Sequence, residues 1–437
     1  MLNYDIAVIG GGIAGYSAAL HALEQGKKVV LISKGQSALH FSSGSIDVLG
    51  KTPAGEDVSA PFHAIEQFAE RFPAHPYAKL SAQSVRRALR WFQTALAQQG
   101  IPLQSEEDEH NHFRITPLGT LKATWLSQPF VYRHRQRLPF KRLLLVSVDG
   151  YRDFQPLLAK DNLRKQRDFA QCAVEEISVT IPGCEQLRRN PNELRSIDIA
   201  RLLKQPQAFN SLCHQLMKRA TPDDLLIMPA IMGNGDGLVL LEKLRRETRL
   251  HFHEVPTMPP SLLGIRIEEA LHKRFVQAGG TLLKGDQVTR GEWHSEQQLK
   301  AIYTRNLGDM ALHAKAFILA SGSYFSQGLK ANLSEIVEPI FGLEMVSNSA
   351  RSTWRAEKFF SPIGHPFMAF GVKTDGTFRP YLHGALCQNL YCCGSVLAGY
   401  DPVFEGSGGG VAISTALAAA QHAVLHCEVQ TQEECVL

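Results

Sequence analysis

The sequence is poor in the features that mark several large classes of protein. Its 437 residues include only eight cysteines, with no C-x-x-C pair and no spacing typical of a zinc or iron–sulfur site. The formal net charge is +4, a surplus too small to indicate a nucleic-acid partner. With 44% hydrophobic residues, the composition also disfavours a disordered chain. We therefore predict a folded protein with no metal site, no disulfide framework and no nucleic acid.

Long uncharged hydrophobic runs are equally rare. The N-terminus has no basic residues before its apolar run, so we predict a strand there and no signal peptide. Residues 406–427 contain no lysine, arginine, aspartate or glutamate, but they open with Gly-Ser-Gly-Gly-Gly and include several polar side chains. We interpret this stretch as a buried helix with a glycine-rich entrance, so a membrane association is expected to come through a partner.

What the sequence does have is a glycine-rich turn between a strand and a helix. Residues 5–10 form a short apolar run, residues 13–25 have the apolar spacing of a helix, and residues 28–33 form a second β-branched run. This strand–helix–strand opening predicts an α/β protein with a Rossmann-type, doubly wound parallel sheet.

The turn between the first strand and the helix fits G-x-G-x-x-G in residues 10–15, in the structural context that the pattern requires. Gly10 permits a tight turn, Gly12 lets a phosphate approach the backbone, and Gly15 lets the helix pack closely on the strand. The helix N-terminus adds unpaired N–H groups and a partial positive charge. The turn therefore predicts a site for a dinucleotide or flavin phosphate.

One part of this fingerprint is missing. The second strand ends in Ser33-Lys34, where an acidic residue would accept hydrogen bonds from an adenosine ribose. Three interpretations follow. The cofactor is FMN, which has no adenosine; or FAD binds with its ribose held otherwise, for example by Ser33; or Lys34 meets the 2′-phosphate of NADP.

Three further segments rich in glycine and hydroxyl side chains follow predicted strands, at residues 37–45, 321–323 and 394–410. Ligands of open α/β sheets bind at the carboxyl edge where such loops emerge. The candidate cofactor-binding residues are Gly10, Gly12, Ala14, Gly15, Ser33, Lys34, Ser42, Ser43, Gly44, Ser45, Ser321, Gly322, Gly394, Ser395, Gly408, Gly409 and Gly410.

The regular strand and helix patterns lie near both ends of the chain, and the middle is less regular. We therefore predict a discontinuous flavin-binding domain with a middle region inserted into it. The predicted flavin-binding domain comprises residues 1–50, 259–345 and 366–437. The inserted cap, substrate or partner-docking region comprises residues 51–258 and 346–365.

Seven motifs, spread over nearly the whole chain, carry a family resemblance. They are QSALHFSSGS from Gln36, TPLGT from Thr116, TWLS from Thr124, PPSLLGIR from Pro259, FVQAGG from Phe275, ASGSYFSQGL from Ala320 and GSVLAGYDP from Gly394. In these motifs and in their order, the chain resembles the B subunits of anaerobic glycerol-3-phosphate dehydrogenases. More distantly, its two ends resemble the flavoproteins of succinate dehydrogenase and fumarate reductase.

The resemblance implies an oxidoreductase subunit that takes part in oxidising sn-glycerol 3-phosphate to dihydroxyacetone phosphate. Electrons would pass to a quinone pool that serves fumarate or nitrate respiration. The resemblance also implies FMN in this chain, with FAD as the alternative. Its partners would be an FAD-containing catalytic A subunit and a membrane-associated iron–sulfur C subunit. The expected location is the cytoplasm, peripheral to the inner membrane through a partner.

Such a reaction needs a base for the hydroxyl proton and cations for the phosphate. The candidate bases are His40, His365 and His383, and the candidate phosphate ligands are Arg351 and Arg355, four residues apart on one expected helix face. Two alternatives stay open: an electron relay or scaffold beside a catalytic subunit, and an NADP-linked flavoprotein reductase.

Overall fold

The computed structural model describes residues 2–135, 139–187, 194–295 and 297–436. The chain divides into two compact units. Unit 1 comprises residues 1–38, 47–95 and 270–437, and unit 2 comprises residues 39–46 and 96–269. Two helices, α4 (Ala82–Ala97) and α10 (Leu262–Gln277), have residues in both units.

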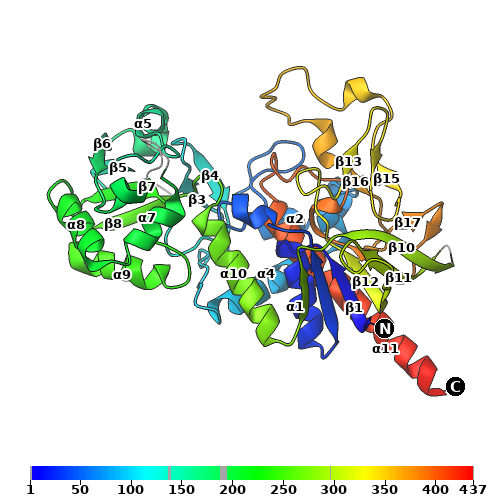
Figure 1. Ribbon diagram of the computed structural model, residues 1–437. Helices are drawn as coiled ribbons and strands as arrows, with labels where there is room; N and C mark the ends of the chain where they lie inside the picture. The colour runs from blue at the N-terminus through cyan, green and yellow to red at the C-terminus, as the bar shows by residue number, and fades with distance from the viewer. Residues whose placement is uncertain (1, 136–138, 188–193, 296, 437) are drawn as a thin grey trace. The chain divides into compact units, whose positions relative to one another are not determined.

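Unit 1 is built on a seven-stranded mixed sheet (Figure 1). Its central strands are parallel and run in the order β9-β2-β1-β12, with β19 also parallel to β12; β11 and β10 continue the sheet beyond β12 in antiparallel fashion. The strands are β1 (Leu2–Ile9), β2 (Val29–Ser33), β9 (Thr281–Lys284), β10 (Val288–Ser295), β11 (Gln298–Thr304), β12 (Leu312–Leu319) and β19 (Leu390–Cys392).

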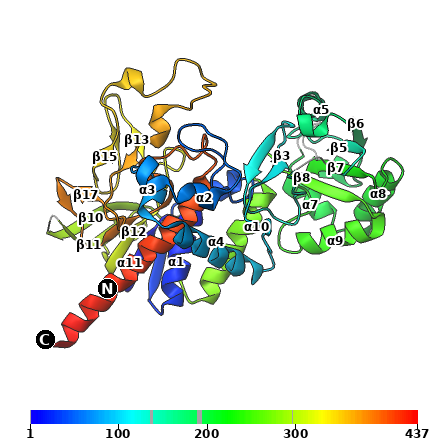
Figure 2. The ribbon, with the colours of Figure 1, turned by 180° about the vertical axis from the view of Figure 1, so that it is seen from behind.

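Two long helices cover one face of this sheet, α1 (Ile13–Glu24) and α11 (Gly408–Val436) (Figure 2). All of β2 and the carboxyl-terminal halves of β1 and β12 are buried, which explains why these segments read as continuous apolar runs. Among the described residues, one helix is long and apolar enough to cross a membrane, α11 over Gly408–Thr431, and 67% of its apolar window is buried inside the protein. That degree of burial is typical of a core helix.

Smaller elements complete unit 1. Three two-stranded ribbons lie along the chain between β12 and β19: β13 (Lys330–Ala331) with β14 (Ile336–Val337), β15 (Met345–Val346) with β16 (Gly371–Val372), and β17 (Tyr381–Leu382) with β18 (Ala385–Leu386). The short helices are α2 (Pro61–Ile65) and α3 (Phe68–Arg71), and the 3₁₀ turns are η1 (Ala38–Phe41), η2 (Pro76–Lys79), η4 (Arg351–Thr353), η5 (Pro366–Ala369) and η6 (Gly394–Val396). Of these turns, η1 spans the junction with unit 2.

Unit 2 holds a second parallel sheet, with strand order β6-β5-β7-β8. The first crossover leads from β5 to β6 and the next returns past β5 to β7, which is doubly wound topology. Its strands are β5 (Arg142–Val148), β6 (Ala173–Val179), β7 (Asp224–Pro229) and β8 (His251–Val255), with a separate hairpin of β3 (His112–Ile115) and β4 (Leu121–Thr124). Its helices are α5 (Pro156–Leu163), α6 (Cys184–Leu187), α7 (Ser196–Leu202), α8 (Pro206–Met217) and α9 (Gly237–Thr248), and it has one 3₁₀ turn, η3 (Arg167–Phe169).

The observed division differs from the predicted domain boundaries. Residues 51–95 belong to unit 1 instead of the insertion, because His75 bonds Glu405 in the buried interior and Trp91 donates to Glu24 of α1. Residues 346–365 also belong to unit 1, since β15 pairs with β16 on the other side of this segment. The predicted fold class, an α/β fold with a Rossmann-type parallel sheet in a discontinuous domain, is confirmed.

Candidate functional site

The turn after β1 is packed so tightly that only glycine fits at two of its positions. Gly10 has φ +120°, and a Cβ there would lie 2.1 Å from the carbonyl oxygen of Ala320. A Cβ on Gly15 would lie 1.8 Å from the carbonyl oxygen of Gly10. The loop therefore lies directly against both the neighbouring strand end and the first turn of α1, as the glycine pattern predicts.

The remaining glycine of the pattern, Gly12, has free space around it. Gly12 is the N-cap of α1, no side chain caps the helix there, and nothing lies within 4 Å of the position that a Cβ would take. The first N–H groups of the helix therefore have no side-chain acceptor at the N-cap. A helix of this length attracts an anion at such an end through these N–H groups and its dipole.

A cavity of about 440 Å³ lies at this helix end (its residues belong to unit 1). Residues that follow β1, β2, β12 and β19 line it, so it sits at the carboxyl edge of the parallel strands, where open α/β sheets bind ligands. The lining residues are Gly10 to Ala14, Ser33 to Ala38, Ala320 to Gly322, Phe325 to Gln327, Ser395 and Ala412. A larger cavity, of about 520 Å³, lies at the opposite end of β1, around Asn3 and Tyr4, away from the glycine turn.

One polar atom in the cavity wall has no partner within the described part of the chain. The hydroxyl of Ser321, at the end of β12, is buried and makes no hydrogen bond there. A buried hydroxyl without a partner is unfavourable, so this atom favours a polar ligand in the cavity. Together with the open helix end, it makes the cavity suitable for the phosphate and sugar-like chain of a flavin nucleotide.

We expect Ser321→Ala to weaken flavin binding about fivefold without changing the fold, because it removes one hydrogen bond of about 1 kcal/mol. Isothermal titration with the flavin measures the loss. Ser147→Ala is the matched control, since the Ser147 hydroxyl donates to the Ile177 carbonyl within unit 2 and does not line the cavity. Equal affinities of wild-type protein and Ser321→Ala would contradict the assignment.

The strand end that lacks the acidic residue is held by a different contact. The Lys34 ammonium donates to the amide oxygen of Gln327 at 2.6 Å, so it ties the end of β2 to the loop after β12. Gln327 has φ +62°, an uncommon conformation for a residue other than glycine. Both side chains are exposed and line the cavity. Ser33 and Lys34 therefore lie at the predicted site, and neither supplies a carboxylate for a ribose.

The glycine-rich segment of residues 394–410, which ends in the first turn of α11, contributes less to the cavity than predicted. Ser395 lines it, and Gly394, with φ +75°, lies against Ala14. By contrast, Gly408, Gly409 and Gly410 are not among the lining residues. A Cβ on Gly410 would lie 2.2 Å from the Tyr77 hydroxyl, so this glycine serves internal packing.

The hydroxyl-rich loop after β2 is split between the two units. Ser37 and Ala38 line the cavity in unit 1, whereas residues 42–45 belong to unit 2. There, the Ser43 and Ser45 hydroxyls are 2.9 Å apart, the Gly44 N–H bonds the Ser42 hydroxyl at 3.2 Å, and the Arg114 guanidinium donates to the Ser43 carbonyl. That these residues bind a cofactor stays a prediction.

The candidate catalytic residues are divided between the two units. His40 belongs to unit 2, with its Nδ1 3.3 Å from Glu268. Both ring nitrogens of His365 are engaged locally: Nδ1 accepts from the Ala356 N–H, and Nε2 lies 2.9 Å from the Phe359 carbonyl. We interpret His365 as a structural residue that stabilises its own loop through these two contacts.

The arginine pair is also arranged differently from the prediction. Arg351 and Arg355 do not share a helix, because η4 is a 3₁₀ turn of three residues that ends at Thr353. The guanidinium of Arg351 donates to the carbonyls of Asn332 and Leu333. Predicting one helix face from the spacing of four was therefore wrong, and the phosphate role stays untested.

Two other features of the sequence have structural roles in the described residues. Burial raises the pKa of the Cys393 thiol to about 12 and that of Cys392 well above its usual range, so these thiols stay protonated within the core. In the basic stretch 133–142, Arg133 pairs with Glu106, and Arg135 pairs with Asp108. Arg137 lies outside the described residues.

Sequence reasoning missed part of the cavity wall. Phe325, Ser326 and Gln327 come from the loop after β12, and Gln36 and Ala412 complete the lining. The available signal was topological: every loop that follows a parallel strand reaches the same sheet edge. Reading the Ser321-Gly322 turn as the start of a longer cavity loop would have found Phe325, Ser326 and Gln327.

The sheet, the glycine turn and the cavity define a nucleotide-binding flavoprotein fold. The family model described as "FAD binding domain" matches residues 5–411. The chain is 72% identical to the B subunit of anaerobic glycerol-3-phosphate dehydrogenase from Vibrio vulnificus strain YJ016 and 56% identical to that from Vibrio cholerae El Tor Inaba N16961, each match covering 100% of both chains. The open conformation of a flavocytochrome c3 fumarate reductase is similar at a TM-score of 0.44 and 9% identity, covering 98% of this chain and 79% of that one.

The chain belongs to the family of anaerobic glycerol-3-phosphate dehydrogenase B subunits, a flavin-binding oxidoreductase family. The resemblance carried by the seven motifs is therefore confirmed. The relatives' names make each of them one subunit of a heteromeric enzyme. The family model supports a flavin cofactor, and the flavin in its name is FAD.

Proposed function

We propose that this chain is the flavin-carrying B subunit of an enzyme that oxidises sn-glycerol 3-phosphate to dihydroxyacetone phosphate. One observation carries the proposal: a chain 72% identical, over its full length, to a B subunit of this enzyme has a cavity at the N-terminus of α1, where no side chain caps the helix. Electrons would then pass to a quinone pool that serves fumarate or nitrate respiration.

The chain's own residues would bind and orient the cofactor. The open end of α1 at Gly12 receives a phosphate, and Ser321 hydrogen-bonds the polar chain of the flavin. Lys34 adds a positive charge at the cavity mouth. When bound, a flavin supplies a hydride acceptor for the C2 hydrogen of a secondary alcohol.

One observation favours a relay role over substrate oxidation within this chain. Of the described residues that line the cavity, Lys34 is the only one with an acidic or basic side chain. A hydride transfer from an alcohol needs a base for the hydroxyl proton, and an ammonium that bonds an amide oxygen at 2.6 Å is poorly suited to that role. We therefore keep an electron relay beside a catalytic subunit as the second candidate function.

The partners follow from the same proposal. An A subunit with FAD would hold the other redox site, and an iron–sulfur C subunit would attach the complex to the membrane. In the described residues, no group of three or more histidine, cysteine, aspartate or glutamate side chains is placed to hold a metal. The proposed location is the cytoplasm, peripheral to the inner membrane through the C subunit.

The first experiment identifies the flavin. We propose FMN, because the end of β2 offers Ser33 and Lys34 in place of a ribose-binding carboxylate. Purified chain is denatured, and the released flavin is separated by chromatography. Release of FAD would overturn FMN and show that the ribose is held in another way.

The second experiment tests the substrate. We expect anaerobic addition of glycerol 3-phosphate to bleach the flavins of the assembled complex, with dihydroxyacetone phosphate as the product. The isolated chain is measured in parallel: bleaching there assigns hydride transfer to this chain, and its absence assigns it to the partner. Bleaching by NADPH alone would favour the reductase alternative, and no response of the complex to glycerol 3-phosphate would refute the proposed substrate.

A further inference from the structure

The most exposed apolar side chains of the described residues gather in one part of unit 1. Five large hydrophobic residues are more than three quarters exposed, and all of them fall between residues 333 and 403. They are Leu333 (86%), Phe359 (83%), Phe360 (89%), Ile363 (79%) and Val403 (76%), and we call this set the apolar crest. Single exposed apolar residues are ordinary, but a group this exposed usually marks an interaction surface.

The three loops that carry the crest are tied to one another. Arg351 donates to the carbonyls of Asn332 and Leu333, which joins the tip of the β13–β14 ribbon to the segment after β15. At the other end, the Gly364 backbone lies against Asp401 and Phe404, so the turn that carries Val403 packs on the same segment. The three loops that carry the crest are therefore joined by direct contacts.

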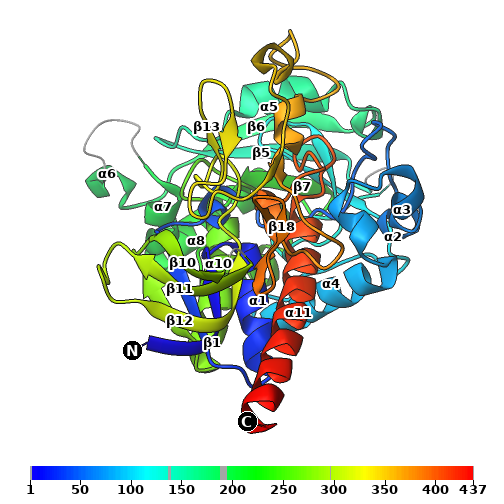
Figure 3. The ribbon, with the colours of Figure 1, turned by 90° about the vertical axis from the view of Figure 1, so that its right-hand side faces the viewer.

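The central loop, residues 347–365, extends away from the sheet of its unit and is held in a defined conformation (Figures 1 and 3). The Trp354 indole N–H donates to the Asn348 carbonyl at 2.6 Å, and the His365 ring bonds both Ala356 and Phe359. The Phe359 and Phe360 rings meet edge to face, 4.9 Å apart. Two fixed, exposed aromatic rings lose little conformational entropy on binding, as in the anchor residues of protein interfaces.

The charges around these rings are mostly positive. Arg355 and Lys358 are exposed and precede the phenylalanines, and Glu357 is the one acidic side chain between Arg351 and His365. The other two loops of the crest carry the acids Glu335 and Asp401, so the positive charge is confined to the central loop. Apolar anchors beside a basic loop fit a protein surface that has an apolar pocket with acidic side chains next to it.

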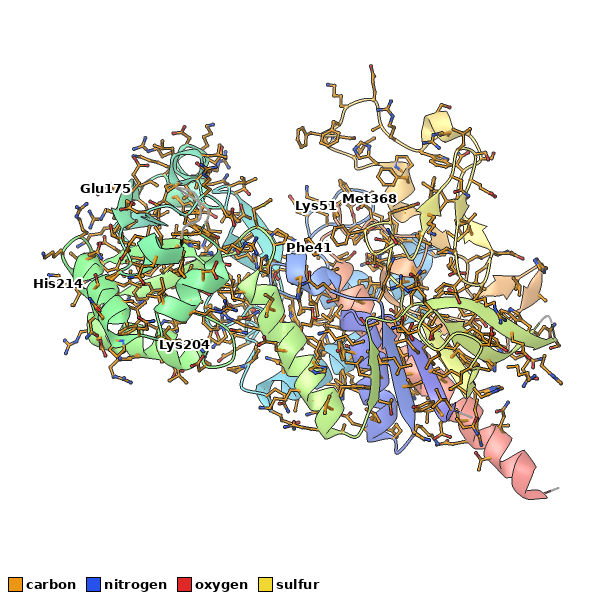
Figure 4. All side chains as sticks on the ribbon, in the orientation of Figure 1. Phe41, Lys51, Glu175, Lys204, His214 and Met368 are labelled. Atoms are coloured by element: carbon orange, nitrogen blue, oxygen red, sulfur yellow. The ribbon has the colours of Figure 1, made fainter. Side chains whose placement is uncertain are left out.

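The crest is also continuous with the wall of the flavin cavity. The loop ends at η5, where Met368 is labelled in Figure 4. In η5, Phe367 packs edge to face on Tyr324, with ring centroids 5.7 Å apart, and its carbonyl accepts from the Tyr324 hydroxyl at 3.3 Å. Tyr324 lies in the loop whose next three residues line the cavity. A protein docked on the crest would therefore touch the segment that positions the cavity wall.

We propose that the apolar crest is the docking surface for another subunit of the dehydrogenase, which presents an apolar pocket with acidic side chains next to it. The inference rests on the proposed function, because membership in a heteromeric enzyme is what requires such a surface. The relatives' names, each a subunit of a heteromeric enzyme, favour a protein partner, and the vesicle measurement below tests a bilayer as the alternative.

The test uses the complete complex, with the full-length chain co-expressed with the other subunits and one partner subunit tagged. We expect Phe359→Ser/Phe360→Ser to reduce recovery of this chain on the tagged partner at least tenfold. Leu157→Ser/Val239→Ser is the matched control, since these residues of α5 and α9 are 66% and 67% exposed and lie outside the crest. Lys358→Glu tests the basic loop, and we expect a smaller loss that is strongest at low salt.

Flavin content and thermal unfolding of the isolated variants separate docking from folding. The proposal requires both to match the wild-type chain while recovery falls. Unchanged recovery of the double phenylalanine variant overturns it. Two other results also overturn it. If the double phenylalanine variant loses binding to phosphatidylcholine–phosphatidylglycerol vesicles while subunit recovery stays intact, the crest is assigned to the membrane. If light scattering shows that the variant changes from dimer to monomer, the crest is assigned to a second copy of the chain. If the wild-type complex assembles but glycerol 3-phosphate does not reduce its flavins, the proposed function fails while the docking surface stands.

Discussion

Gly15→Ala is expected to abolish flavin binding and to destabilise unit 1 by about 3 kcal/mol, the upper range for overpacking in a close-packed interior. The added methyl would lie 1.8 Å from the Gly10 carbonyl oxygen, which is backbone and itself packs against the end of β12. Relief requires α1 to move away from β1, and that movement opens the turn that holds the phosphate. Urea unfolding and flavin titration measure the two effects.

Gly12→Ala provides the control, because the two glycines belong to one motif and differ in their surroundings. Nothing lies within 4 Å of a Cβ at Gly12, and its φ of −86° suits any residue. We expect this variant to keep wild-type stability to within about 0.5 kcal/mol, as surface substitutions usually do, and to lose flavin affinity because the methyl enters the cavity. Equal stability losses at both positions would contradict the packing explanation.

Glu254→Ala is expected to destabilise unit 2 by about 3–5 kcal/mol, the usual effect of breaking a buried ion pair from one side. Glu254 at the end of β8 is fully buried and bonds Arg266 at 2.8 Å. The same carboxylate accepts the backbone N–H groups of Ile231 and Met232, so its loss leaves three donor groups unsatisfied in the interior. Hydrogen exchange of the β7 and β8 amides reports this unit separately.

An exposed ion pair of the same unit is the control. Lys141 and Asp223 are 2.6 Å apart but mostly solvated, with side-chain exposures of 82% and 60%. Asp223→Ala should therefore change stability by less than about 1 kcal/mol. The explanation fails if the Glu254 variant protects the β7 and β8 amides as well as the wild-type chain does.

The strands and the helix of the cofactor turn could be predicted because their local and global requirements agree. β2 and the carboxyl-terminal half of β1 are buried and read as apolar runs, and α1 begins at the glycine pattern and ends one residue before the predicted Gln25. The same holds for β12 and β19 near the other end of the chain. The cavity at their carboxyl ends follows from the topology alone.

Apolar runs mark two strands of the second parallel sheet, β5 and β7, but its strand β8 was missed because buried polar residues interrupt the pattern. β8 reads HFHEV, and both His253 and Glu254 are fully buried. They are tolerated because each has partners: His253 lies 2.9 Å from the Ile115 carbonyl and accepts the Tyr132 N–H, and burial lowers its pKa to about 4. A pattern of apolar residues cannot reveal a strand that is buried through hydrogen bonds made by distant segments.

The edge strand β6 could not be predicted from the sequence for a different reason. Its sequence AVEEISV exposes two glutamates together, so neither a continuous apolar run nor a clean alternation marks it as a strand. The predicted domain boundaries differ from the observed units because long-range contacts decide them. The buried bond between His75 and Glu405 joins positions far apart in the sequence, and no local signal assigns residues 51–95 to the cofactor unit.

The pairing of β1 with β12 has a consequence for the order in which the protein is made. Leu2 pairs with Leu312, and the fourth strand that edges the cavity, β19, does not leave the ribosome until after residue 392. Most of unit 2, by contrast, is one continuous stretch, residues 96–269, with its strands paired among themselves. Domains generally fold as units in the order of synthesis, so the second sheet should form while the first strand still waits for its partner. We therefore expect cofactor loading to be a late, post-translational event that requires nearly the whole chain.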